Sequence, residues 1–187
     1  MYQTTDFKKG LKVEYKDEAW TIVEAKHVNP GKGSAFVKTK LKNLETGRVL
    51  EINFKAGVDK LGVPDVQFVE MQYLYHDGEK YMFMNNSTYD QVGLTEEEVG
   101  YAKDYIVENM TLRVTFYKNK PVAVDIDNFM ELAVKETQPN IKGDTSGGGG
   151  KPATMETGLV VTVPFHIKEG DVLKIDTREG KYIEKVK

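Results

Sequence analysis

A single lysine, Lys32, stands between two glycines and behind a proline in the stretch HVNPGKGSAFVK, residues 27–38. Glycine permits backbone angles that other residues avoid and lets another backbone approach closely, while Pro30 stiffens the entry to the turn. The Lys32 amine therefore points outward on a flexible stem, which suits contact with phosphate or covalent extension by a modifying enzyme. We predict a functional tip formed by Lys32 and by the loop residues Asn29, Pro30, Gly31, Gly33 and Ser34.

Further positive groups lie close to this tip in the sequence. Three lysines alternate with Val37, Thr39 and Leu41, so we expect these lysines to line one face of a strand. Such a stripe suits contact with an RNA backbone. The predicted RNA-contacting residues are Lys26, His27, Lys38, Lys40 and Lys42. An ordinary solvated strand face is the alternative that this pattern leaves open.

Other chemical motifs fail on inspection. A phosphate-binding P-loop needs Ser or Thr directly after the lysine and a glycine at position 26, where Lys26 stands. The chain has no cysteine, and its three histidines are far apart, which disfavours zinc. Asp125 and Asp127 lie two apart on a predicted strand, where we expect a solvated edge rather than an acid/base pair. We therefore predict no catalytic residue, no metal, no cofactor and no enzyme.

The elements that must position the tip are strands. Leu50, Ile52 and Phe54 alternate with polar residues, and the same period of two recurs along the chain. Glycine-containing turns at residues 45–47, 76–79 and 178–181 predict hairpins. One helix is predicted over residues 95–106, where Thr95 and Glu98 form a capping box.

Short strands with frequent turns indicate an all-β chain of small barrels rather than one large sandwich. Turn-rich joints divide the 187 residues into predicted domains 1–64, 65–128 and 129–187. Each is about 60 residues long, a size that folds alone only marginally. The glycine-rich stretch 143–151 is predicted to be a long loop inside the third domain, because a strand pattern resumes directly after it.

Charge is distributed unevenly over these three parts. Residues 1–64 carry 12 Lys and Arg against 8 Asp and Glu, residues 65–128 carry 5 against 12, and residues 129–187 carry 9 against 9. A basic first third beside an acidic middle third suits a molecule that offers one end to phosphates. No stretch approaches the roughly 20 apolar residues of a membrane span, and the start lacks a signal-peptide pattern. We expect a cytoplasmic protein without a membrane partner.

Three separated stretches occur in one order along the chain: HVNPGKGSAFVKTKLKNLETG, GDTSGGGGKPATMETGLVVTVP and KEGDVLKIDTREGKYIEKV. Together they resemble the bacterial translation elongation factor P family, and the resemblance covers the whole chain. It implies an SH3-like (KOW-type) barrel that carries the tip, followed by a central and a C-terminal OB-type barrel. The family arrangement is an L that is similar to tRNA in outline.

The resemblance also implies a function. Members bind the ribosome between the peptidyl and exit tRNA sites and relieve stalling at consecutive prolines. Lys32 matches the tip lysine that reaches the acceptor end of peptidyl-tRNA and that a modifying enzyme extends in many members, and Gly31 and Gly33 match its flanking glycines. Residues Gly143, Asp144 and Thr145 match a loop associated with messenger RNA in the exit site. A monomer is expected.

Position 29 departs from the family, since Asn29 stands where many members carry lysine. The chemistry of any Lys32 extension stays open: β-lysylation and other lysine extensions remain, whereas rhamnosylation is disfavoured because it uses arginine.

Two other classes of protein also stay open. A general RNA-binding OB protein would offer aromatic stacking platforms beside basic grooves, but the aromatics Tyr73, Tyr75, Tyr81 and Phe83 lie in the acidic third, where we expect packing. A metabolic lysine-carrier domain would be a single barrel.

Overall fold

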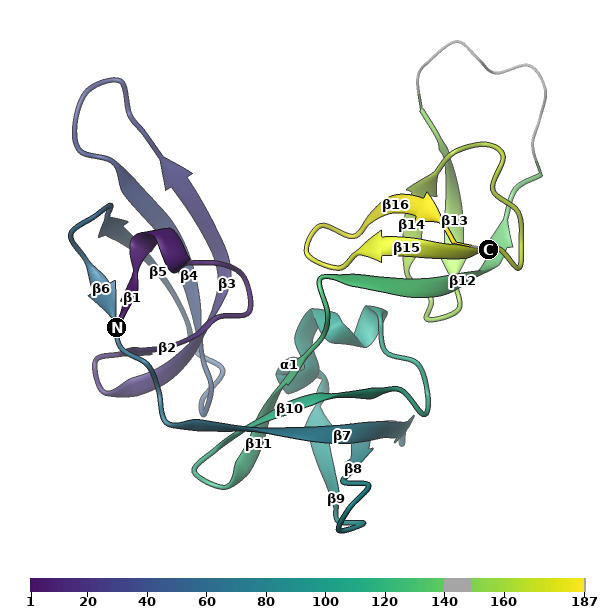
Figure 1. The fold of residues 1–187 in the computed structure, drawn as a ribbon, viewed down its shortest axis with the longest axis horizontal. Helices are drawn as coiled ribbons and strands as arrows, with labels where there is room; N and C mark the ends of the chain where they lie inside the picture. The colour runs from purple at the N-terminus through teal and green to yellow at the C-terminus, as the bar shows by residue number, and fades with distance from the viewer. Residues whose placement is uncertain (140–148, 187) are drawn as a thin grey trace.

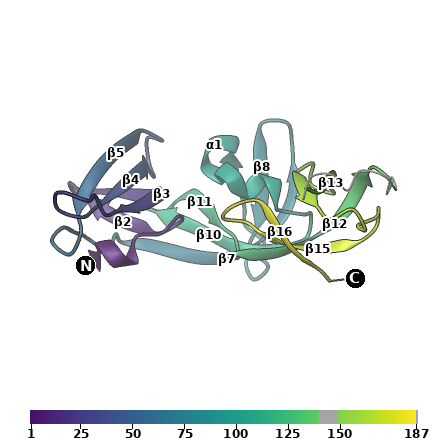
Figure 2. The same cartoon turned by 90° about the horizontal axis from the view of Figure 1, so that it is seen from above.

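A computed structural model describes residues 1–139 and 149–186 and shows three groups of β-strands in chain order (Figure 1). We call them the N-terminal unit (β1–β6), the middle unit (β7–β11) and the C-terminal unit (β12–β16). Seen from above, the units follow one another in a row (Figure 2), and in Figure 1 both end units rise on the same side of the middle one. The molecule is therefore bent, with the middle unit at the bend. A likeness to tRNA stays a prediction, as do domain boundaries at residues 64 and 128.

The N-terminal unit contains the sheet that carries the tip. Its elements are β1 (Tyr2–Gln3), the 3₁₀ helix η1 (Thr4–Asp6), β2 (Lys12–Tyr15), β3 (Glu18–Val28), β4 (Phe36–Asn43), β5 (Val49–Lys55) and β6 (Lys60–Leu61). Strands β2-β3-β4-β5 form an antiparallel sheet, and β1 pairs with β6. The buried Trp20, Ile22, Val37 and Leu41 lie at the centre of its core.

The middle unit is a five-stranded sheet in the order β11-β10-β7-β8-β9. Its elements are β7 (Val66–His76), β8 (Lys80–Met84), β9 (Gln91–Thr95), α1 (Glu96–Val99), the 3₁₀ helix η2 (Gly100–Asp104), β10 (Thr111–Tyr117) and β11 (Lys120–Asp125). Tyr73 and Phe83 are buried in its core, and Tyr81 packs against that core as expected. The packing expected for Tyr75 is wrong, because its side chain is 46% exposed.

The C-terminal unit is also a five-stranded sheet, in the order β14-β13-β12-β15-β16. Its strands are β12 (Phe129–Thr137), β13 (Lys151–Met155), β14 (Val160–Val163), β15 (Val172–Asp176) and β16 (Lys181–Lys185). Tyr105, which follows η2 of the middle unit, is buried in this core beside residues such as Leu132 and Ile175. The middle and C-terminal units therefore share apolar packing.

The single helix predicted over residues 95–106 is wrong in its length. The predicted capping box is present: Thr95 Oγ1 accepts from Glu98 N, and the Glu98 carboxylate accepts from Thr95 N. Gly100 then takes φ +61° and ends α1 after one turn, and the chain continues as η2. Within the described residues no helix has the length and the apolar character needed to cross a membrane.

Candidate functional site at the Lys32 tip

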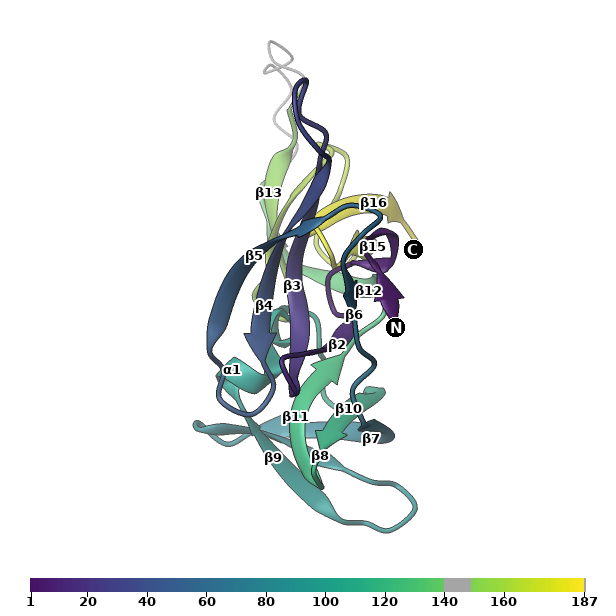
Figure 3. The same ribbon diagram turned by 90° about the vertical axis from the view of Figure 1, so that its left-hand side faces the viewer.

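The tip lies at the end of the longest hairpin of the N-terminal unit. Strands β3 and β4 pair as far as Val28 and Phe36, and β5 extends the support, since Phe36 also pairs with Lys55. A backbone hydrogen bond of 2.9 Å from Ala56 N to Ala35 O adds a further rung. Residues 29–34 lie beyond this three-stranded base and are exposed. Figure 3 shows the β3–β4 connection at the end of the molecule farthest from the middle unit.

The two glycines of the tip differ in their backbone demands. Gly33 has φ +109°, a conformation that L side chains rarely adopt. Gly31 has no positive φ, and a Cβ added there would meet no atom within 4 Å. The fold alone therefore favours glycine at position 33, whereas the surroundings of position 31 within the chain have room for a Cβ.

Lys32 is exposed and makes no hydrogen bond or ion pair with any residue that the structure describes. Other lysines of the same unit are engaged. Lys12 pairs with Asp125 across 2.6 Å and Lys26 with Glu24 across 3.0 Å. The Lys32 ammonium is thus a free charge at the end of a supported hairpin.

The alternation predicted on β4 is confirmed, since Val37, Thr39 and Leu41 are buried and Lys38 is exposed. Cross-strand pairs place Lys26 opposite Lys38, and Lys40 between Glu24 and Glu51. The stripe is therefore interrupted by two carboxylates rather than uniformly basic.

Lysines pair with both carboxylates on this face. Lys26 lies 3.0 Å from Glu24, and Lys38 lies 3.5 Å from Glu51. The hydrogen bond and charge of Lys26, with smaller contributions from Lys40 and Lys38, lower the pKa of Glu24. The net positive charge available to RNA on this face is correspondingly small.

Two other predicted RNA-contacting residues are not free cations on this face. His27 is opposite the buried Val37 in the β3–β4 register, so its side chain lies on the other side of the sheet from Lys26 and Lys38. Lys42 donates to the backbone carbonyl of Glu97 in the middle unit. The predicted residues Gly143, Asp144 and Thr145 lie outside the described residues.

Asp125 is not the solvated strand edge that the sequence predicts. Its side chain is 18% exposed, and its Oδ1 lies 2.6 Å from the ammonium of Lys12, which is only 7% exposed. Thr115 Oγ1 donates to Asp125 Oδ2 across 2.8 Å. This buried pair joins the N-terminal unit to the middle unit. The two residues are 113 positions apart, so no local pattern could have revealed their contact.

No group of three or more His, Asp or Glu side chains that could hold a metal ion occurs in residues 1–139 and 149–186. What the site offers is an exposed amine on a rigid base. This arrangement can bind or position a partner.

Similarity to known proteins extends over the whole chain. The elongation factor P of Wolinella succinogenes is 50% identical over 186 residues, which cover 100% of this chain and 99% of the relative. That of Carboxydothermus hydrogenoformans is 51% identical over 186 residues and 100% of both chains. The chain belongs to the elongation factor P family. It is accordingly a translation factor, and membership of this family implies an interaction with the ribosome and tRNA.

Three models of this family match successive parts of the chain. "Elongation factor P (EF-P) KOW-like domain" matches residues 3–60, "Elongation factor P (EF-P) OB domain" matches 66–124, and "Elongation factor P, C-terminal" matches 130–185. The predicted all-β class, with a KOW-type domain followed by OB-type domains, is confirmed. A solved structure titled as eukaryotic translation initiation factor 5A from Methanococcus jannaschii matches 66% of this chain and 91% of its own, at 18% identity and a TM-score of 0.39. Elongation factor P is named as a translation factor, not as an enzyme.

Proposed function

We propose that this protein binds the ribosome between the peptidyl and exit tRNA sites and stimulates peptide-bond formation at consecutive prolines. The Lys32 tip contacts the acceptor end of peptidyl-tRNA and holds it in place. The observation that carries the proposal is the free Lys32 ammonium on exposed residues 29–34, beyond a three-stranded base. Membership of the elongation factor P family supports the ribosomal setting.

The mechanism is one of orientation. Proline is a poor partner in peptide transfer because its ring restricts the backbone, and a loosely held tRNA end adds to the difficulty. Fixing two reactants in the right geometry is worth several kcal/mol of the barrier without any general base. Lys32 acts as a clamp in this scheme, and a modifying enzyme that extends its amine would lengthen its reach and add hydrogen-bonding groups.

We also propose contacts with further partners. We assign RNA-backbone contacts to Lys26, Lys38 and Lys40, whereas Lys42 is bonded to the middle unit and His27 lies on the other side of the sheet. Contact with messenger RNA in the exit site is assigned to residues 143–145 on the family resemblance. The protein acts in the cytoplasm as a monomer.

The test uses the protein purified from its own host, so that any extension of Lys32 is retained. A reconstituted translation system times a reporter with three consecutive prolines against a proline-free reporter. Wild type should accelerate only the proline reporter, and Lys32→Ala should abolish the acceleration. Lys60→Ala, another exposed lysine of the same unit, is the matched control and should behave as wild type. If wild type leaves both reporters unchanged, the proposed function fails.

A further inference from the structure

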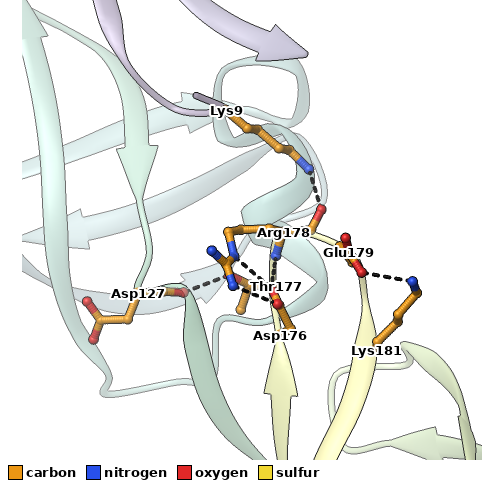
Figure 4. A network of polar contacts seen from close by, with 7 residues as sticks. All are labelled: Lys9, Asp127, Asp176, Thr177, Arg178, Glu179 and Lys181. Carbon is orange, nitrogen blue, oxygen red and sulfur yellow. Dashed lines mark hydrogen bonds and ion pairs between the residues drawn. The ribbon is translucent and has the colours of Figure 1, made fainter. Parts of the chain in front are cut away.

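The three units meet at one junction, where a lysine of the N-terminal unit reaches the C-terminal unit. Lys9 Nζ lies 3.4 Å from the carbonyl oxygen of Arg178, in the turn between β15 and β16. It also lies 3.7 Å from the ring centroid of Tyr101 in the middle unit. Figure 4 shows Lys9 extending toward this turn. Burial lowers the pKa of Lys9, which indicates that its ammonium is partly shielded from water.

The turn that receives Lys9 is itself held rigidly. The Arg178 guanidinium donates to both carboxylate oxygens of Asp176, with distances of 3.0 and 2.8 Å. Thr177 Oγ1 donates to the Asp127 carbonyl oxygen across 2.7 Å (Figure 4). Thr177 N also donates to Asn128 O across 2.9 Å. The Arg178 carbonyl is therefore fixed relative to the segment that joins the middle and C-terminal units.

The N-terminal unit packs on the middle unit through a small buried apolar cluster, in which Ala19 and Leu44 lie with Val122 and Ala123. A cleft of about 210 Å³ lies between the two, and residues of both units line it, including Lys9, Lys12 and Val124. Thr21 also lines this cleft, and its buried hydroxyl has no hydrogen-bond partner among the described residues. A small apolar cluster and separate polar contacts therefore hold the N-terminal unit on the middle unit, with the cleft beside them.

These contacts close a triangle. Lys12 and Asp125 join the N-terminal unit to the middle unit, and Thr177 joins the C-terminal unit to the segment that follows β11. Among the described residues, Lys9 to Arg178 is the only hydrogen bond between residues 1–64 and residues 129–186. Contacts of the middle unit with each end unit do not by themselves fix the orientation of the N-terminal unit relative to the C-terminal unit. A third contact, made directly between these two end units, restricts that orientation.

We propose that Lys9 is a positioning residue that fixes the orientation of the Lys32 tip relative to the rest of the molecule. Its role in translation rests on the proposed function. Its aliphatic stem crosses the junction, and its ammonium ties the N-terminal unit to Tyr101 and to the Arg178 carbonyl at once. Without that tie, the N-terminal unit pivots about its contact with the middle unit. The tip then samples orientations that do not meet the tRNA end.

The test measures the distance between the end units directly. The chain has no cysteine, so spin labels attach only at introduced sites, Asn53→Cys in the N-terminal unit and Lys168→Cys in the C-terminal unit. Both positions are exposed. Lys9→Met keeps the aliphatic stem but removes the charge and the hydrogen-bond donor. It should broaden the distribution of label-to-label distances, with a roughly fivefold smaller population at the distance found in wild type. Lys9→Arg should retain the wild-type distribution.

Lys8→Met is the matched control, because it removes a neighbouring exposed lysine that makes no side-chain hydrogen bond or ion pair in the part of the chain described. In the translation assay Lys9→Met should slow the proline reporter alone, with unfolding of the N-terminal unit unchanged. An unchanged distance distribution in Lys9→Met overturns the inference, as does a broadened distribution with wild-type proline rescue. If wild type itself gives no rescue but Lys9→Met broadens the distribution, the proposed function fails and the structural role of Lys9 stands.

Discussion

Replacing Lys12 with methionine should strongly destabilise the docking of the N-terminal unit. The Lys12 side chain is 7% exposed, and its ammonium lies 2.6 Å from Asp125, which is 18% exposed. Removing one partner of a buried ion pair costs about 3–5 kcal/mol, because the other charge stays buried without compensation. Asp125 keeps the Thr115 hydroxyl, some contact with water and the Arg113 guanidinium, whose Nε lies 4.0 Å from Oδ2, so we expect the lower end, about 3 kcal/mol.

A second substitution distinguishes the effect of losing the ion pair from the effect of losing side-chain packing. Asp125→Asn keeps an acceptor for Thr115 but removes the charge, so the double variant with Lys12→Met carries no buried ion. Its free energy of unfolding should return to within about 1 kcal/mol of wild type. The two substitutions should therefore be coupled by at least about 2 kcal/mol in a double-mutant cycle, because the cost of Asp125→Asn alone adds to the difference.

Urea unfolding followed by tryptophan fluorescence is the suitable assay. Trp20 is the single tryptophan, it is 1% exposed, and it lies in the core of the N-terminal unit. Lys118→Met is the control, because Lys118 pairs with Glu45 between the same two units but both side chains are exposed. That variant should unfold as wild type does. If Lys12→Met lowers the free energy of unfolding by less than about 1 kcal/mol and shows no coupling to Asp125→Asn, the ion pair does not stabilise the fold as argued.

Other substitutions test the tip, the shared core and the acid response. Gly33→Ala should cost about 1 kcal/mol in urea unfolding, because Gly33 has φ +109°, while Gly31→Ala should leave stability unchanged yet slow the proline reporter. Tyr105→Ala should cost about 3 kcal/mol in thermal unfolding of the C-terminal unit, whose core its ring fills. The hydrogen bond from the Arg178 side chain lowers the pKa of Asp176. The ionised carboxylate therefore stabilises the fold at pH values above about 3.9, the ordinary pKa of Asp, and this stabilisation is lost as the pH falls through the lowered pKa. The urea unfolding midpoint, measured at a series of acidic pH values, should therefore fall less steeply with pH in Asp176→Asn than in wild type.

Local structure was predictable wherever neighbouring residues alone decide it. The alternation along 36–43 predicted a strand with one buried face, and β4 has that pattern. The turn at 45–47 forms because Asn43 Oδ1 accepts from the backbone N–H groups of Glu45 and Thr46, and Gly47 takes φ +72°. These signals lie within a few residues of one another, so they are visible in the sequence itself.

Predictions failed where a distant residue or a single backbone angle decides the outcome. The helix over 95–106 is interrupted because Gly100 adopts φ +61°, although the residues around it keep a helical pattern. Asp125 was predicted to be a solvated strand edge, yet it pairs with the buried Lys12 of another unit and is only 18% exposed. Buried charge between units depends on tertiary placement, which strand periodicity does not encode.

The tip could be predicted because its signal is local, but the stripe behind it could not. Lys38 and Lys40 share a face as predicted, yet the register brings Glu24 and Glu51 onto the same face. A bulge between Ile22 and Glu24 shifts the β3–β4 register, and a shift of one residue in β3 would have moved Glu24 to the other side of the sheet.

The distribution of paired and free charge in the N-terminal unit favours a positioning factor over a general RNA-binding surface. A general binder gains affinity from many unpaired cations along a groove. Here Lys26 and Lys38 face carboxylates and Lys42 is bonded to the middle unit, whereas Lys32 is free on an exposed loop. A single cation such as Lys32 contributes little affinity, but it has a defined location. Its value depends on how firmly the hairpin and its unit are held, which rests on the Lys12 contact with the middle unit and, in our proposal, on the Lys9 contact with the C-terminal unit.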